Sequence, residues 1–153
     1  MTHTLRALLF AGLLVPYAAL AQPIQAEQPW ARATAPQQKV GGAYVTLTSP
    51  AGDRLLGASS PIAGRVELHE MQTEGDVKRM RELTGGLALP AGQAVAMAPG
   101  GYHLMLMDLK QPLVAGQAIP VQLRFRDAPP MEVQAVVAPV GASGPSAKSG
   151  HVH

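Results

Sequence analysis

Residues 65–83, with the sequence RVELHEMQTEGDVKRMREL, carry the most informative structural signal in this chain. Apolar Val66 and Leu68 alternate with polar residues over 65–69, which is typical of a β-strand with one buried face. The turn-forming segment 73–76 follows, and we expect 77–83 to return as the partner strand, so the segment predicts a β-hairpin. Because strand side chains alternate between faces, this hairpin also decides which polar residues of the segment can meet.

The first strand of this hairpin separates two aliphatic residues from two candidate metal ligands. Val66 and Leu68 share one face, which we expect to be buried. His69 and Met71 share the other face, so we expect them to point outward or toward a rim. Met80 lies among charged residues on the return strand, which argues against a gap-filling role in the core. A surface histidine with core methionines is the alternative interpretation at this point.

A second run, 102–109, carries histidine and methionine at the same spacing. His103, Met105 and Met107 share one face and aliphatic residues occupy much of the other, so both faces are apolar. Such a strand is typical of the centre of a fold, and we expect Met107 to pack in the core. His103 follows the turn at 99–101, where we expect it at the edge of the core with one ring nitrogen exposed.

The rest of the chain predicts further short strands and no helix. Its 16 glycines and 14 prolines recur at short intervals instead of forming one linker. No segment shows a sustained helical stripe with caps. We therefore expect an all-β protein, an antiparallel sandwich or barrel, with further strands at 30–34, 43–48, 53–59, 87–89, 94–97, 119–125 and 131–137.

The two ends of the chain differ from the domain between them. Residues 1–21 combine a positive charge at Arg6, an apolar run and a small-residue end before Gln22, which predicts a signal peptide. We expect one domain over 22–140, no membrane span after signal cleavage, and a flexible tail over 141–153. Export without cysteines for disulfides favours the periplasm.

Composition excludes several classes of function. Without cysteine the chain has no catalytic thiol, no zinc–thiolate site, no thiol for lipid attachment and no cysteine ligand for blue copper. Twelve scattered Lys and Arg residues nearly balance ten Asp and Glu residues, which argues against nucleic acid as a partner. The HEM run at 69–71 lacks the second histidine of a zinc protease, and no triad or phosphate-loop motif is present. We therefore predict that the chain is not an enzyme.

Two histidines together with several methionines indicate a soft metal ion. Imidazole and thioether suit Cu(I), whereas Mg²⁺ and Ca²⁺ prefer oxygen and zinc usually takes more histidine, cysteine or carboxylate ligands. A copper site is one interpretation of these residues. A metal-free β-sandwich binding module, in which the methionines only fill the core, is the other.

The order of these residues resembles the PCu(A)C family of periplasmic copper chaperones. Ten residues separate His69 from Met80, and twenty-two separate Met80 from the His103-x-Met105 pair. The second gap in the family is about twenty-one residues, and a turn absorbs one extra residue readily. The phrases VELHEM and PGGYHLMLM are also similar to that family.

This resemblance implies a cupredoxin-like Greek-key β-sandwich that binds one Cu(I) near its surface. The ligands that it implies are His69, Met80, His103 and Met105. Met71 would be an auxiliary residue beside them. The tail residues His151 and His153 are further candidates, and would add an affinity for Cu(II).

The resemblance also implies a monomer that delivers copper for assembly of the copper centre of cytochrome c oxidase. The recipient would be subunit II of that oxidase or a Sco-type thiol protein. A general periplasmic protein for copper buffering or resistance is the alternative with the same chemistry.

Overall fold

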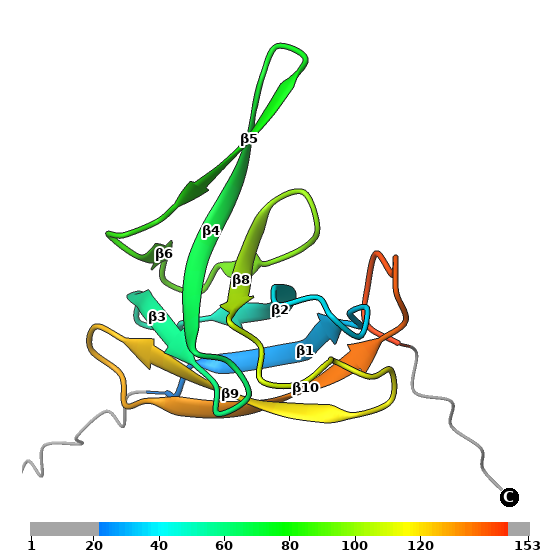
Figure 1. Ribbon diagram of the computed structural model, residues 1–153. Helices are drawn as coiled ribbons and strands as arrows, with labels where there is room; N and C mark the ends of the chain where they lie inside the picture. Colours follow the sequence, from blue (N-terminus) through cyan, green and yellow to red (C-terminus); the bar gives the residue numbers. More distant parts are fainter. Residues whose placement is uncertain (1–21, 147–153) are drawn as a thin grey trace, which may run out of the picture.

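The computed structural model describes residues 22–146, which form ten β-strands and no helix (Figure 1). The predicted signal peptide, 1–21, lies outside the described residues, as do residues 147–153. Each expected strand is present, and the largest shift is in β1, which begins at Gln25 instead of Trp30. The strands are β1 (Gln25–Arg32), β2 (Gly41–Thr48), β3 (Asp53–Ser59), β4 (Arg65–Glu74), β5 (Val77–Glu82), β6 (Leu87–Leu89), β7 (Ala94–Ala96), β8 (Tyr102–Met107), β9 (Ala118–Phe125) and β10 (Met131–Ala138).

The strands form one hydrogen-bonded sheet that curls back on itself. Its order is β5-β4-β8-β2-β1-β10-β9-β3-β6, with β7 attached to β2. An additional pairing of β3 with β4, between Ala58 and Val66, joins strands that are distant in this order. Figure 1 shows β4 and β8 on one side of the fold and β1, β9 and β10 on the other. The all-β prediction is confirmed, although β1 and β10 pair in parallel, so the sheet is mixed.

Alternate residues along the strands face inward and fill the core. The pattern is clearest in β9, where every second residue is buried, namely Ile119, Val121, Leu123 and Phe125. Trp30 of β1 stacks on Tyr44 of β2, with 4.4 Å between the ring centroids. Burial of apolar side chains is therefore the main force that holds this chain together, because it has no cysteine for a disulfide.

β8 lies inside the sheet, between β4 and β2, as expected. Its two faces differ, because Leu104 and Leu106 are fully buried whereas Met107 is only half-buried. The expectation that Met107 packs in the core is therefore wrong. Met107 pairs with Arg65 of β4, so this face is bordered by charged side chains instead of a second apolar layer.

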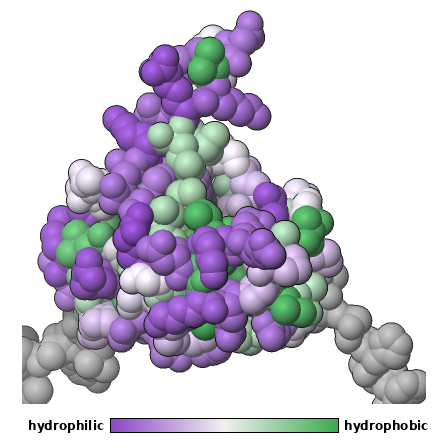
Figure 2. Space-filling model, in the orientation of Figure 1, coloured by the Kyte–Doolittle hydropathy of each residue, from purple (hydrophilic) through white to green (hydrophobic). Residues whose placement is uncertain are grey.

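The β4–β5 hairpin projects from the body of the fold (Figure 1). β5 forms one edge of the sheet, and all of its residues are exposed. Figure 2 shows a mostly hydrophilic surface on this projection, interrupted by a hydrophobic spot near its tip. Because β5 buries no side chain, its position depends on backbone pairing with β4, in a register that sets Met71 opposite Met80.

Asp53, the first residue of β3, joins this strand to the turn between β9 and β10. Its carboxylate accepts hydrogen bonds from the backbone N–H groups of Arg54, Asp127 and Ala128, at 2.6, 3.1 and 2.9 Å. Burial acts to raise the pKa of Asp53, but these hydrogen bonds outweigh that effect and hold the pKa below its usual value. The ionised carboxylate therefore stabilises the folded state.

Asp53→Asn is expected to lower the free energy of unfolding at pH 7 by about 1.5–3 kcal/mol, which is typical of hydrogen bonds to a charged group. Because the folded-state pKa lies below the unfolded value, this stabilisation is present above about pH 4 and is lost as the pH falls further. Urea denaturation of both proteins at pH 7 and at pH 3 measures the difference, which should narrow at pH 3. An equal difference at both pH values would contradict this role of the carboxylate.

Candidate metal centre

Three neighbouring strands, β5, β4 and β8, place the predicted ligands on one face of the sheet. His69 of β4 pairs with His103 of β8, and the two ring centroids lie 5.6 Å apart with 35° between the ring planes. On the other side of β4, Met71 pairs with Met80 of β5. Because residues two apart on a strand share a face, both pairs point to the same side of the sheet. The register thus gathers residues that are far apart in the sequence.

His103 and Met80 are in direct contact, although β8 and β5 lie on opposite sides of β4. His103 Nε2 is 3.3 Å from Met80 Sδ. The other ring nitrogen, Nδ1, is 3.2 Å from the carbonyl oxygen of Gly101, which only accepts hydrogen bonds, so Nδ1 carries the proton of the neutral ring. The lone pair of Nε2 therefore faces the thioether sulfur, which is itself a lone-pair donor. A shared metal ion would stabilise two such donors.

The surroundings of His103 favour its neutral form. Burial lowers the pKa of His103; the hydrogen bond to Gly101 opposes this effect, and the nearby His69 adds to it. Neutral imidazole is the form that binds metal ions. The Gly101 carbonyl also accepts the backbone N–H of Met71, at 3.1 Å, and so joins the start of β8 to β4.

His69 is more deeply buried than its sequence pattern predicted, with only 9% of its surface exposed. The ring lies on the expected face, opposite Leu68, but it is buried instead of exposed because β5 and β8 flank both edges of β4. His69 Nε2 lies 2.8 Å from Oε2 of Glu67, two residues earlier on the same face. His69 Nδ1 is buried and has no hydrogen-bond partner within residues 22–146. Such buried polar atoms are rare, and this nitrogen is free to bind a metal ion.

Glu67 belongs to a chain of charged groups beside the two histidines. Arg65 Nε donates a hydrogen bond to Glu67 Oε1 at 2.8 Å, and Arg65 Nη1 donates one to Asp108 Oδ2 at 2.9 Å. The hydrogen bond from Arg65, and after it that from His69, lowers the pKa of Glu67. These charged residues were not among the site residues expected from the sequence. The signal that could have found two of them is that positions 65, 67 and 69 share one face of the expected strand.

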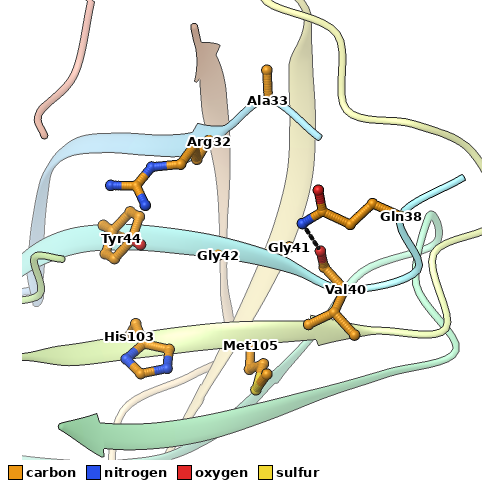
Figure 3. Close-up of a pocket in the computed structure, with 9 residues that line it drawn as sticks. All are labelled: Arg32, Ala33, Gln38, Val40, Gly41, Gly42, Tyr44, His103 and Met105. Carbon is orange, nitrogen blue, oxygen red and sulfur yellow. Dashed lines mark hydrogen bonds between the residues drawn. The ribbon is translucent and has the colours of Figure 1, made fainter. Parts of the chain in front are cut away.

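Met105 follows His103 on the same face of β8, where it pairs with Glu67 of β4 on one side and Gly42 of β2 on the other. His103 and Met105 line an open cavity of about 230 Å³, which Figure 3 shows together with Tyr44. A Cβ atom at Gly42 would lie 2.8 Å from the Tyr44 hydroxyl, so the glycine leaves room for that group. The cavity gives small donors a path to two of the expected ligands.

Arg32 lines the side of this cavity away from His103 (Figure 3). It also holds the start of the predicted tail. Its guanidinium donates two hydrogen bonds to the carbonyl oxygen of Ala142, at 3.0 and 2.6 Å. Burial raises the pKa of the nearby Tyr44 hydroxyl, with Arg32 acting in the opposite direction, so this phenol is protonated at neutral pH. The tail candidates His151 and His153 lie outside the described residues.

The grouped side chains provide soft donors. Within residues 22–146, no three His, Cys, Asp or Glu side chains gather in a way that could hold a metal ion. Two donors bonded to one d¹⁰ ion at zinc-like bond lengths lie about 3.5 Å apart, close to the separation of His103 Nε2 and Met80 Sδ. Mixed imidazole and thioether coordination is suited to Cu(I). The residues present therefore fit a soft monovalent ion.

Residues 24–137 match the protein family described as "Putative lipoprotein LpqE-like". A "Putative lipoprotein" of Leifsonia xyli subsp. xyli is 38% identical over 107 residues, which cover 70% of this chain and 64% of the relative. An uncharacterized protein of Rickettsia prowazekii is 32% identical over 105 residues, which cover 65% of this chain and 58% of the relative. The chain thus spans less than two thirds of the length of these curated relatives.

Solved structures of PCuAC domains share the fold. The apo PCuAC domain of PmoF2 is 26% identical with a TM-score of 0.65, covering 82% of this chain and 97% of that one. The copper-bound PCuAC domain of PmoF2 is also 26% identical, with a TM-score of 0.63 over 78% and 96%. Apo-DR1885 from Deinococcus radiodurans is 30% identical with a TM-score of 0.60, over 91% and 97%. The expected cupredoxin-like fold is confirmed.

Among the described residues, no helix is long and apolar enough to cross a membrane.

The family match covers most of the chain, and the 30% identity to DR1885 extends over nearly the whole of both proteins, which is more than a likeness of fold. The chain therefore belongs to the LpqE-like family, which is the PCu(A)C family.

Proposed function

We propose that this protein is a copper chaperone that binds Cu(I) at its histidine–methionine centre and passes the ion to another protein. The proposed ligands are His69, Met80, His103 and Met105, with Met71 as an auxiliary donor. The observation that carries the proposal is the 3.3 Å contact between His103 Nε2 and Met80 Sδ, two lone-pair donors with no proton to share in the neutral ring. The copper-bound PmoF2 domain and the Cu(I) form of DR1885 support the choice of ion.

The chemistry of these donors suits a carrier of Cu(I). Thioether sulfur binds a soft d¹⁰ ion without losing a proton, so only the two imidazoles have to be neutral for binding. A thiolate site would have to release a proton for each sulfur. Protons therefore compete with imidazole binding below about pH 6.5 and with thiolate binding already below about pH 8.5.

Transfer by ligand exchange requires that an incoming donor reach the ion. Met80 is 48% exposed and lies on the edge strand β5. His103 and Met105 line the cavity of about 230 Å³ shown in Figure 3. A partner's donor can therefore approach on the Met80 side or through the cavity while the remaining ligands still hold the ion.

We further propose that the protein acts in the periplasm, as a monomer and not as an enzyme. The signal-like sequence of residues 1–21 supports export, as do the lipoprotein descriptions of the family and of its Leifsonia relative. This chain has no cysteine for lipid attachment, so we propose a soluble exported form.

The proposed recipient is subunit II of cytochrome c oxidase or a Sco-type thiol protein. Thiolates attract Cu(I) strongly, and this chain contains none, so transfer toward a thiol is favourable. Incubation of the Cu(I)-loaded protein with each copper-free recipient, followed by separation and metal analysis, tests the proposal. Movement of copper to either recipient is expected. Retention of copper against both would contradict delivery and favour copper buffering.

Met105→Ala and His103→Ala each remove a proposed donor. Losing a residue that only hydrogen-bonds to a ligand weakens metal binding by about 10–100-fold, and we expect each of these two substitutions to weaken Cu(I) binding by more than that. Met107→Ala is the matched control, since Met107 lies on the same face of β8 but pairs with Arg65, away from the other ligands. Competition with a chromogenic Cu(I) chelator measures the affinity. X-ray absorption should detect both sulfur and nitrogen around copper. Equal losses for Met105→Ala and Met107→Ala would count against Met105 as a ligand.

His103 of the copper-free protein is expected to titrate below about pH 6.5, the usual value for histidine, because burial lowers its pKa. The unfolded chain then takes up this proton before the folded protein does. The stabilisation that neutral His103 contributes to the copper-free protein is therefore complete above about pH 6.5 and is lost as the pH falls through the lower folded-state pKa. NMR of the histidine Cε1–H signals against pH gives the midpoint, and a value at or above the usual one would contradict the prediction.

A further inference from the structure

The two ring nitrogens of His69 have different surroundings. Nε2 lies 2.8 Å from Oε2 of Glu67. Nδ1 is buried and has no hydrogen-bond partner among the described residues. An ionised carboxylate only accepts hydrogen bonds, so the nitrogen that faces it carries the proton of a neutral imidazole. The lone pair of His69 is therefore on Nδ1, the buried nitrogen.

We propose that Glu67 is a positioning residue that keeps the proton of His69 on Nε2, so that His69 binds the cargo ion through Nδ1 while His103 binds it through Nε2. This inference rests on the proposed function, because it takes His69 as a ligand of Cu(I). Carboxylate partners of this kind fix the orientation and tautomer of metal-binding histidines and increase their basicity.

The two histidines are prepared in opposite ways. The carbonyl oxygen of Gly101 lies 3.2 Å from Nδ1 of His103 and holds the proton there, which leaves Nε2 free. The Glu67 carboxylate holds the proton of His69 on Nε2, which leaves Nδ1 free. Since the two residues are directly paired across β4 and β8, the site presents one nitrogen of each kind from facing positions.

Arg65 decides how residue 67 can interact. Arg65 Nε donates to Glu67 Oε1 at 2.8 Å, and Asp108 accepts from Arg65 Nη1 at 2.9 Å, so the guanidinium is held between two carboxylates. Arginine has donors and no acceptor. A glutamine at position 67 would therefore turn its oxygen toward Arg65 and its NH₂ group toward His69. The ring would then have to accept at Nε2 and carry its proton on Nδ1.

The first measurement assigns the nitrogens in the unmodified protein. NMR of protein labelled with ¹⁵N-histidine gives the tautomer of each ring in the metal-free state above pH 7. Ag(I), a diamagnetic d¹⁰ ion, then replaces Cu(I), and the scalar coupling between silver and nitrogen identifies the bound atom. We expect His69 protonated at Nε2 before loading, and coupling to His69 Nδ1 and His103 Nε2 after it. Coupling to His69 Nε2, or a metal-free His69 protonated at Nδ1, would overturn the inference.

The second measurement tests Glu67 by substitution. Glu67→Gln is expected to move the His69 proton to Nδ1 and to weaken Ag(I) and Cu(I) binding by about 10–100-fold. Adding Arg65→Ala should let the amide turn its oxygen toward His69, returning the proton to Nε2 and restoring part of the affinity. Glu132→Gln is the matched control, because Glu132 is an exposed carboxylate that accepts a hydrogen bond from Gln134, two residues along β10.

The outcomes separate this inference from the proposed function. If the unmodified protein binds neither ion, the proposed function fails, and the tautomer of metal-free His69 still decides whether Glu67 positions the ring. If both ions bind and Glu67→Gln keeps the Nε2 proton and full affinity, the proposed function stands and the role of Glu67 is overturned. The spectra of the unmodified protein decide the nitrogen assignment even if Glu67→Gln fails to fold.

Discussion

The antiparallel register of β4 between β5 and β8 is the constraint on which the whole site depends. It sets His69 opposite His103 and Met71 opposite Met80. A shift of either pairing by one residue would turn an entire row of side chains to the other face. The leucine of the next pair, Leu68, would then occupy the site, and the histidine would be driven into the core. The pairing of the backbone therefore determines the positions of the donor side chains.

That register is in turn specified by hydrophobic burial. Leu68 and Leu104 form the pair next to the two histidines and point to the opposite face, where both are buried. The same strands thus stabilise the fold with one face and carry the polar donors on the other. Because the core faces already determine the pairing, the fold does not need the ion to bring the donors together. An ion that leaves can do so without unfolding the domain.

The strands and the hairpin could be predicted from sequence because alternation and turn residues are local signals, as in the run of 65–83. The candidate ligands came from the resemblance to the PCu(A)C family, and the structure pairs His69 with His103 and sets His103 Nε2 3.3 Å from Met80 Sδ. The depth of burial could not be predicted. Period-two alternation identifies the face of Met107 or His69, but how far that face is covered depends on the side chains of the neighbouring strands, such as β5 and β8 beside His69. The role of Glu67 depends on side-chain orientation, which sequence spacing does not specify.

Because β5 lies at the edge of the sheet, the free energy of opening it locally differs from the free energy of unfolding the whole domain. β5 pairs with β4 and buries none of its side chains, and elements with few buried contacts open locally at a much smaller cost than the whole domain. Met80 lies on this strand, so in the proposed copper-bound form local opening of the β4–β5 hairpin would withdraw its sulfur while the leucine core remains intact. The lifetime of the proposed complex would then depend on this local opening, and a domain that resists denaturation strongly could still release the ion quickly.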